Sequence, residues 1–248
     1  MDLGASFDPT TVAAVVFDIG GVFLYPSYKP VQQRQLELGL DPSNGPDDYR
    51  RAHHQGCAAL SASILATQGN SGPGDEGASD FWSKYDNAYL GALGLSGEQV
   101  ELCRDAVRTS WDWPHEANIT AFRRLAGLGL PLAIVSNNDG SAEPSMQEFG
   151  VCQVGQGPLP TVVAIVDSAI LGIAKPDPAI MAPALAALDQ PTEHVLYVGD
   201  TVHADVVGAT NAGMQVVQLD PFDQHGDYSH RRLVDLDELT DLLGAGRV

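Results

Sequence analysis

Acidic or hydroxyl residues end three of the short apolar runs in this sequence. The runs are Val12 to Asp18, Leu130 to Ser136 and Val195 to Asp200. Runs of this length without polar alternation predict strands buried on both faces, and therefore a parallel sheet. Ligands bind at the C-terminal ends of the strands in such sheets. We therefore expect Asp18, Ser136 and Asp200 to meet at one edge of the sheet.

Two further side chains could join this group. Asp205 follows Asp200 by five residues, and Lys175 lies in a Pro-rich, loop-forming segment at 174–178. A single aspartate at the end of a strand is more often a turn former or a helix cap. The combination is more specific, because three acids, a hydroxyl and one of only three lysines in the chain are expected at the same edge.

The elements that position these residues alternate along the chain. Two more strands are predicted, at Thr161 to Val166 and Gln215 to Asp220. Helices are predicted at Ala117 to Leu128, Pro178 to Leu188, Ala204 to Ala212 and Leu236 to Leu243. Asp177 is the expected N-cap of the second helix, with Pro178 at its first position. Strand and helix in alternation predict a doubly wound, Rossmann-like α/β sheet.

Residues 25–113 have a different pattern. They contain no convincing strand, and helices are predicted for about residues 47–66, 80–93 and 98–110, with a Gly/Ser/Pro-rich loop at 67–79. A helical insertion after the first strand indicates a second, smaller all-helical domain. The expected division is an α/β core of residues 1–24 and 114–248 and a helical domain of residues 25–113.

The composition excludes several classes of partner. The chain has 248 residues, with 32 acidic and 13 basic side chains and a formal net charge of −19 at pH 7. Nucleic acids and anionic membranes would be repelled, so neither is expected as a partner. Cys57, Cys103 and Cys152 form no CxxC pair and are expected to be buried free thiols. Without a signal peptide or membrane-length apolar run, we expect a cytoplasmic protein.

Four motifs, in order, make the chain resemble the haloacid dehalogenase-like hydrolase superfamily. They are Phe17-Asp18-Ile19-Gly20-Gly21-Val22, Val135-Ser136-Asn137, Lys175-Pro176-Asp177-Pro178, and Val198-Gly199-Asp200 with Asp205 five residues further on. The resemblance covers nearly the whole chain. It implies a Rossmann-like core with a helical cap inserted between the first and second motifs.

The resemblance also implies a reaction. Asp18 would attack a phosphoryl group and form an aspartyl-phosphate, which water then hydrolyses. Mg²⁺ would let an anionic nucleophile approach an anionic phosphate. Its ligands would be the carboxylates of Asp18 and Asp200, the backbone carbonyl of Gly20 and, directly or through water, Asp205.

The remaining motif residues would bind the substrate. The phosphoryl group would be held by Ser136, the backbone amide of Asn137, Gly21 and Lys175. Lys175 would also neutralise charge on Asp18, as a compact cation. These roles imply a Mg²⁺-dependent phosphomonoesterase whose substrate is a small phosphorylated metabolite, such as a sugar phosphate.

The first motif departs from the phosphatase pattern at Gly20. Phosphatases of the superfamily usually carry a second aspartate there, which protonates the leaving group and later activates water. General acid–base catalysis of this kind is typically worth about 10²–10⁴ in rate. An anomeric sugar phosphate would need less protonation. The candidate replacement groups are His203, His53, His54, Tyr25 and Tyr28.

Two other functions stay open beside the phosphatase. A 2-haloacid dehalogenase, in which Asp18 attacks carbon, also lacks the second aspartate of the first motif. Those relatives hold no metal, however, and usually replace the acidic fourth motif, whereas Asp200 and Asp205 are both present here. A binding or regulatory protein would keep the fold and lose turnover. The paired acids favour phosphoryl chemistry.

Overall fold

The computed structural model describes residues 2–67, 78–226 and 228–245. The predicted loop at 67–79 therefore lies mostly outside the described residues. The chain divides into two units. The first comprises Met1–Phe23, Pro114–Pro221 and Gly226–Val248, and the second comprises Leu24–Trp113 and Phe222–His225. The short segment 222–225 thus belongs to the second unit, whereas the sequence pattern placed it in the α/β core.

The first unit is built on a six-stranded sheet with the order β10-β9-β8-β1-β4-β7, and the adjacent strands are parallel. Its strands are β1 (Ala14–Phe17), β4 (Leu132–Ser136), β7 (Ala164–Asp167), β8 (Val195–Gly199), β9 (Gln215–Leu219) and β10 (Arg232–Leu233). The chain first builds outward from β1 to β4 and β7, and then returns to β8 on the other side of β1. This reversal makes the C-terminal end of β1 a topological switch point, the place where doubly wound folds bind their ligands.

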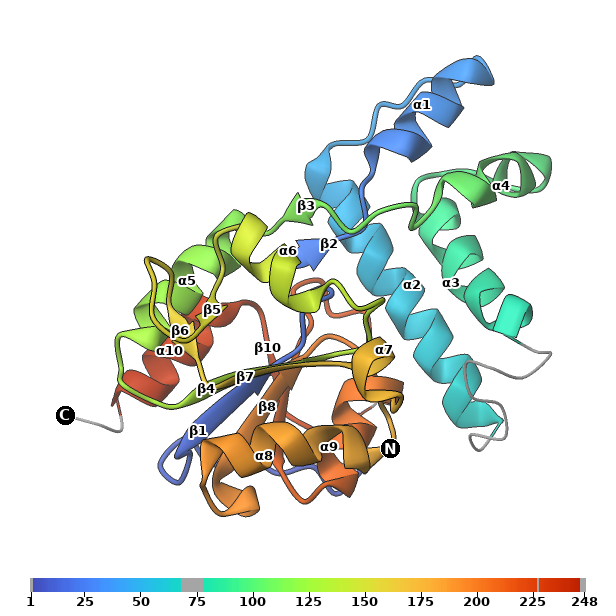
Figure 1. Cartoon of the computed structure of the whole chain (residues 1–248). Helices are drawn as coiled ribbons and strands as arrows, with labels where there is room; N and C mark the ends of the chain where they lie inside the picture. The colour runs from blue at the N-terminus through green and yellow to red at the C-terminus, as the bar shows by residue number, and fades with distance from the viewer. Residues whose placement is uncertain (1, 68–77, 227, 246–248) are drawn as a thin grey trace. The chain divides into compact units, whose positions relative to one another are not determined.

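Helices cover both faces of this sheet. They are α5 (Glu116–Ala126), α6 (Ala142–Glu148), α7 (Ser168–Leu171), α8 (Ala182–Leu188), α9 (Val207–Asn211) and α10 (Leu236–Ala245). Figure 1 shows α5 and α10 on one face and α8 and α9 on the other. Right-handed crossovers require this distribution, because the direction of strand addition changes after β7. The predicted Rossmann-like α/β fold is confirmed.

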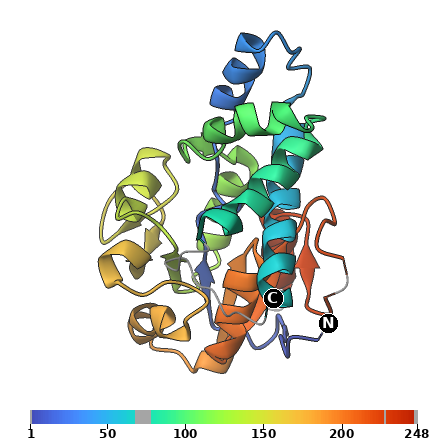
Figure 2. The same cartoon turned by 90° about the vertical axis from the view of Figure 1, so that its right-hand side faces the viewer.

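The second unit is mainly helical. It contains α1 (Lys29–Glu37), α2 (Pro46–Ala66), α3 (Ala78–Ala92) and α4 (Glu98–Cys103), and the two-residue strands β2 (Leu24–Tyr25) and β3 (Trp113–Pro114) pair where the chain enters and leaves it. Helices α2 and α3 lie side by side in both views (Figures 1 and 2). Their shared core includes the fully buried rings of Tyr49, Tyr85 and Tyr89.

Several element boundaries differ from the sequence prediction. The strand predicted at 161–166 is two strands, because β6 (Thr161–Val162) pairs with β5 (Gln153–Val154) and only β7 joins the central sheet. The helix predicted at 98–110 ends at Cys103 and continues as a single 3₁₀ turn to Ala106. Helix α1 was not predicted, since its sequence KPVQQRQLE has few apolar residues to reveal a buried face.

Other local predictions are confirmed. The Asp177 side chain accepts a hydrogen bond of 2.9 Å from the Ala179 amide and caps the helical segment that opens at Pro178. The first turn of that segment is 3₁₀ (Pro178–Met181), and α8 follows it. All three cysteines, which lie in the described part of the chain, are buried thiols outside any disulfide. Among the described helices, none has the length and apolarity that crossing a bilayer demands.

Candidate active site in the α/β core

The pairing register brings the ends of three strands to the same level. Phe17 of β1 is paired with Ile134 of β4 on one side and with Val198 of β8 on the other. The Asp18 amide then donates a hydrogen bond of 2.9 Å to the Val198 carbonyl, which extends this pairing one residue beyond β1. The residues that follow β1 and β8, and the last residue of β4, therefore lie along one edge of the sheet.

Three carboxylates gather at this edge. Asp18, Asp200 and Asp205 each offer an oxygen within 4.8 Å of the other two, and all three side chains are buried. Lys175 Nζ lies 2.8 Å from Asp18 Oδ1 and 2.7 Å from Asp205 Oδ1. The structure thus brings together the acids and the lysine that the sequence analysis selected.

Asp205 is held by several donors. It lies on a π-helical turn, Val202–Val206, a rare conformation that is frequent at functional sites. Its Oδ2 accepts hydrogen bonds from the Thr201 amide (2.9 Å) and the Thr201 hydroxyl (2.7 Å). Its Oδ1 lies 3.1 Å from the Tyr197 hydroxyl and also accepts from Lys175. Both carboxylate oxygens of Asp205 are therefore already engaged by donors within the protein.

The second motif positions the lysine. The Asn137 side chain accepts a hydrogen bond of 2.8 Å from the Lys175 amide and donates one of 3.0 Å to the Lys175 carbonyl. This two-sided contact fixes the backbone of the loop that carries Lys175. The sequence analysis assigned only the backbone of Asn137 a role, so this contact was missed. Ser136 is buried at the end of β4, and its contact with a phosphoryl group stays a prediction.

Two glycines give the carboxylates their space. Gly21 has φ +65°, and a Cβ at this position would overlap the carboxylate of Asp200. A Cβ at Gly199 would overlap the carboxylate of Asp205 in the same way. Positive φ and close approach both favour glycine. Gly21 therefore shapes the site, and its proposed contact with substrate stays a prediction.

The buried cluster contains more negative than positive groups, and this imbalance shifts their pKa values. Burial raises the pKa of Asp18 to about 6, Lys175 opposes the rise, and Asp205 and Asp200 add to it. Burial alone would lower the pKa of Lys175, but the charges of Asp18 and Asp205 raise it. Burial would raise the pKa of Asp205, but Lys175 and the Thr201 hydrogen bonds lower it. One ammonium thus faces three carboxylates.

The comparisons with known proteins agree with this geometry. The model of the haloacid dehalogenase-like hydrolase family matches residues 12–213, which contain all four motifs. The chain belongs to the haloacid dehalogenase-like hydrolases. No curated protein sequence matches it significantly.

Solved structures of this hydrolase superfamily share the fold over almost the whole chain. YfnB of Bacillus subtilis, bound to magnesium, has a TM-score of 0.58 at 16% identity, with 94% of this chain and 98% of that one covered. A HAD phosphatase of Thermococcus onnurineus has a TM-score of 0.52 at 21% identity, with 96% of this chain and 100% of that one covered. The L-2-haloacid dehalogenase of Xanthobacter autotrophicus has a TM-score of 0.53 at 18% identity, with 94% of this chain and 98% of that one covered. Such identities show the fold alone.

The groups considered as substitutes for an acid at Gly20 lie in both units of this hydrolase. His203 is half-buried on the π-helical turn that carries Asp205. Tyr25, His53 and His54 are buried in the second unit, where the Tyr25 hydroxyl lies 3.1 Å from His54 Nε2. The role of each as an acid or base stays a prediction, as does that of Tyr28.

Tyr197 is a site residue that the sequence analysis missed. Its hydroxyl lies 2.9 Å from Lys175 Nζ and donates a hydrogen bond of 2.9 Å to the Val135 carbonyl. Burial and the charge of Asp205 raise its pKa well above the ordinary value, so the hydroxyl stays protonated. The available signal was a tyrosine within the otherwise aliphatic strand VLYVG, because a buried hydroxyl must find a partner.

Tyr197→Phe is expected to lower the free energy of unfolding by about 1–3 kcal/mol, because a buried ammonium and a buried carbonyl each lose a partner. Urea denaturation measures this change. Tyr228→Phe, at a half-buried position of the same unit, is the matched control and should change stability by less than about 0.5 kcal/mol. A Tyr197→Phe protein as stable as the control variant would show that the hydroxyl does not support Lys175.

A second missed contact holds Asp200. Gln218 of β9 is fully buried, and its Nε2 donates a hydrogen bond of 2.8 Å to the Asp200 carbonyl. Gln218 Oε1 lies 2.7 Å from Nε2 of the buried His230. A polar side chain inside a buried strand, such as Gln218, must find hydrogen-bond partners within the protein. Here it does so by fixing the backbone of the loop that carries a cluster carboxylate.

Proposed function

We propose that this hydrolase is a Mg²⁺-dependent phosphomonoesterase that acts on a small phosphorylated metabolite. The observation that carries the proposal is the gathering of both acids of the fourth motif with Asp18 around a single lysine. Phosphoryl transfer needs such a site, because a divalent cation must bring together an anionic nucleophile and an anionic phosphate.

The residues present fit a hard divalent cation. Three buried carboxylates and one ammonium leave a net charge of −2 when all are ionised, which one divalent ion would neutralise. Oxygen donors at one edge of a sheet are also the ligand type that Mg²⁺ prefers. Asp18, Asp200 and the Gly20 carbonyl would hold the ion, and Asp205 would act through water. When bound, the ion would supply Lewis-acid polarisation of the phosphoryl group.

The chain's own residues would then perform two displacements. An Asp18 carboxylate oxygen forms a bond to phosphorus while the bond from phosphorus to the leaving oxygen breaks. Water next attacks the aspartyl-phosphate, releases phosphate and restores Asp18. Lys175 stabilises negative charge that develops on the transferred group. Since Gly20 offers no acid, a leaving group that needs little protonation, such as an anomeric sugar oxygen, is the preferred substrate class.

A second candidate function rests on Gly20 itself. Without an acid at this position, Asp18 could displace a halide from carbon, because halide leaves without a proton. A 2-haloacid would then be the substrate, and the reaction would proceed in the presence of EDTA. The carboxylates of Asp200 and Asp205 argue against this function. With no metal ion bound, their negative charges would repel the carboxylate of a 2-haloacid and weaken its binding.

One screen distinguishes the candidates. Purified protein is assayed against phosphorylated metabolites and an activated aryl phosphate, with Mg²⁺ and with EDTA, while 2-haloacids are assayed for halide release. We expect phosphate release that requires Mg²⁺ and is absent from Asp18→Asn. Halide release in EDTA would support the dehalogenase instead. No turnover of any substrate, despite phosphate binding, would support the non-catalytic alternative.

Protons and Mg²⁺ are expected to compete for Asp18. Because the pKa of Asp18 is raised to about 6 in the metal-free protein, the carboxylate is protonated below that pH and cannot bind the ion. The apparent affinity for Mg²⁺ should be constant above about pH 7 and fall by about tenfold per pH unit below about pH 6. Calorimetric titrations at pH 5, 6 and 7.5 measure this dependence. An affinity that does not change with pH would remove Asp18 from the proposed ligands.

A further inference from the structure

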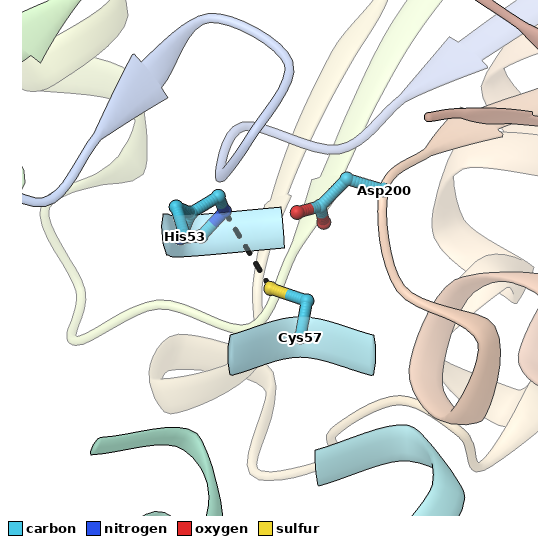
Figure 3. Close-up of side chains that lie close together, drawn as sticks. All are labelled: His53, Cys57 and Asp200. Atoms are coloured by element: carbon cyan, nitrogen blue, oxygen red, sulfur yellow. Dashed lines mark hydrogen bonds between the residues drawn. The ribbon is translucent and has the colours of Figure 1, made fainter. Parts of the chain in front are cut away.

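An imidazole nitrogen and a thiol sulfur, both able to ligate a metal ion, meet in the second unit. His53 and Cys57 occupy positions i and i+4 of α2, so their side chains share one face of the helix. Figure 3 shows the two side chains and the contact between His53 Nε2 and Cys57 Sγ, which measures 3.6 Å. Both residues are buried, with exposures of 1% and 4%.

The second nitrogen of His53 has a partner that fixes the ring. His53 Nδ1 lies 2.7 Å from the hydroxyl of Tyr85 on α3. When Nδ1 donates this hydrogen bond, the lone pair of Nε2 points to the sulfur of Cys57. Metal-binding histidines are usually oriented in this way by an acceptor at their other nitrogen.

The sequence builds this orientation through Gly56. A Cβ at Gly56 would lie 2.6 Å from Tyr85 Cδ2, so only glycine lets the Tyr85 ring pack this closely on α2. The His53 ring is further held edge-on by Tyr25, at a centroid distance of 5.1 Å, and by Trp111, at 5.7 Å. Aromatic packing on two sides leaves the imidazole little freedom to turn away from Cys57.

The spacing of the two atoms matches a tetrahedral metal site. Bonds of about 2.3 Å from zinc to sulfur and about 2.0–2.1 Å from zinc to nitrogen, across a tetrahedral angle, separate the two ligand atoms by about 3.6 Å. A thiol–imidazole hydrogen bond accounts for the same distance in the metal-free protein. A bound cation would therefore replace the shared proton without rearrangement of α2.

We propose that His53 and Cys57 form a binding site for a thiophilic divalent cation such as Zn²⁺. On binding, the Cys57 thiol loses its proton to solvent, and the thiolate and the neutral imidazole each donate one electron pair to the ion. Water completes the coordination. A nitrogen and sulfur pair favours zinc-like ions, whereas carboxylates alone favour Mg²⁺. This site does not depend on the proposed phosphatase activity.

Cobalt(II) is the probe, because its bond to a thiolate gives a charge-transfer absorption band that oxygen ligands do not give. Untagged, reduced full-length protein is titrated with Co²⁺ in the presence of excess Mg²⁺, which occupies carboxylate sites. We expect the band to saturate at one Co²⁺ per chain, to disappear when Zn²⁺ is added and to be absent from Cys57→Ser. Tyr85→Phe should keep the band but weaken the affinity about 10–100-fold.

Cys103→Ser is the matched control, since Cys103 is another buried cysteine of the second unit, and its band should equal that of the unmodified protein. Circular dichroism and thermal unfolding verify that each variant is folded. If Cys57→Ser does not fold, Tyr85→Phe and the Zn²⁺ competition still test the site. The absence of the band from the unmodified protein, its survival in a folded Cys57→Ser protein or its loss in Cys103→Ser would overturn the proposal.

Discussion

Lys175→Met is expected to lower the free energy of unfolding at pH 7 by about 3–5 kcal/mol and to abolish turnover. Methionine preserves most of the buried volume, so the effect isolates the charge. The substitution removes the ion pairs of 2.8 Å to Asp18 and 2.7 Å to Asp205 and leaves buried carboxylates without a cation. Breaking one side of a buried ion pair is costly because the remaining charge stays desolvated.

The loss should depend on pH in a defined direction. In the unmodified protein the pKa of Asp205 is lowered and that of Lys175 is raised, so their pair stabilises the fold fully between about pH 5 and pH 9. Without Lys175, burial dominates and the pKa of Asp205 should rise above its unfolded value. The folded variant then binds more protons than its unfolded state, and its stability falls as the pH rises. We therefore expect Lys175→Met to lose more of the free energy of unfolding, relative to the unmodified protein, at pH 8 than at pH 5.

Urea denaturation of the metal-free proteins at pH 5 and pH 8 measures both effects. Lys84→Met is the matched control, because Lys84 is exposed on α3 and its replacement should change stability by less than about 0.5 kcal/mol. Equal stability of Lys175→Met and Lys84→Met would contradict the buried ion pairs. A deficit that does not change between the two pH values would show that the carboxylates are not its cause.

The position of the carboxylate cluster could be predicted from the sequence because its signals are local. β-branched runs that end in Asp18 and Asp200 specify both a buried strand and the polar group at its end. Parallel pairing then aligns these ends without further information. Asp205 was placed with them because it follows Asp200 by only five residues and because the fourth motif of the family resemblance includes it.

The contacts that orient the cluster could not be predicted in this way. The clamp of Asn137 on the Lys175 backbone joins residues 38 positions apart, and nothing local to either residue indicates it. The same is true of Gln218, which reaches the Asp200 carbonyl from the neighbouring strand. Tyr197 did carry a local signal. Its partners, Lys175 and the Val135 carbonyl, are set by the packing of three strands and could not be read from that signal.

The missed fold elements have a common physical cause. Helices α1 and α6 have mostly polar sequences, α7 has four residues, and β2, β3, β5, β6 and β10 have two residues each, too few to show a period. Strands β1, β4, β8 and β9 of the central sheet were recognised because they are buried along their length and therefore mostly apolar. Sequence pattern thus reports burial reliably and reports short edge structures poorly.

Asp18→Asn should separate function from stability. Asparagine keeps the size of the side chain but cannot act as a nucleophile, so turnover should fall by about 10⁴-fold or more, whichever electrophile is the substrate. The metal-free variant, by contrast, should be as stable as the unmodified protein or more stable. Burial raises the pKa of Asp18 to about 6, so the ionised carboxylate opposes folding at neutral pH, by up to about 3 kcal/mol.

The sign of this stability difference follows from the proton balance. Between about pH 4 and pH 6 the folded protein holds the Asp18 proton that the unfolded chain has lost, so the contribution of Asp18 to stability falls as the pH rises. The asparagine of the variant does not titrate. The stability of the variant relative to the unmodified protein should therefore increase from pH 4 to pH 6 and level off above about pH 7, in urea denaturation with EDTA. Mg²⁺ should reverse the order, because it stabilises only a protein that binds it. An Asp18→Asn protein that is less stable than the unmodified protein at every pH would identify Asp18 as a structural partner of Lys175. A residue that is kept for chemistry at the expense of stability must behave differently. Its replacement must abolish turnover and raise the stability of the metal-free protein.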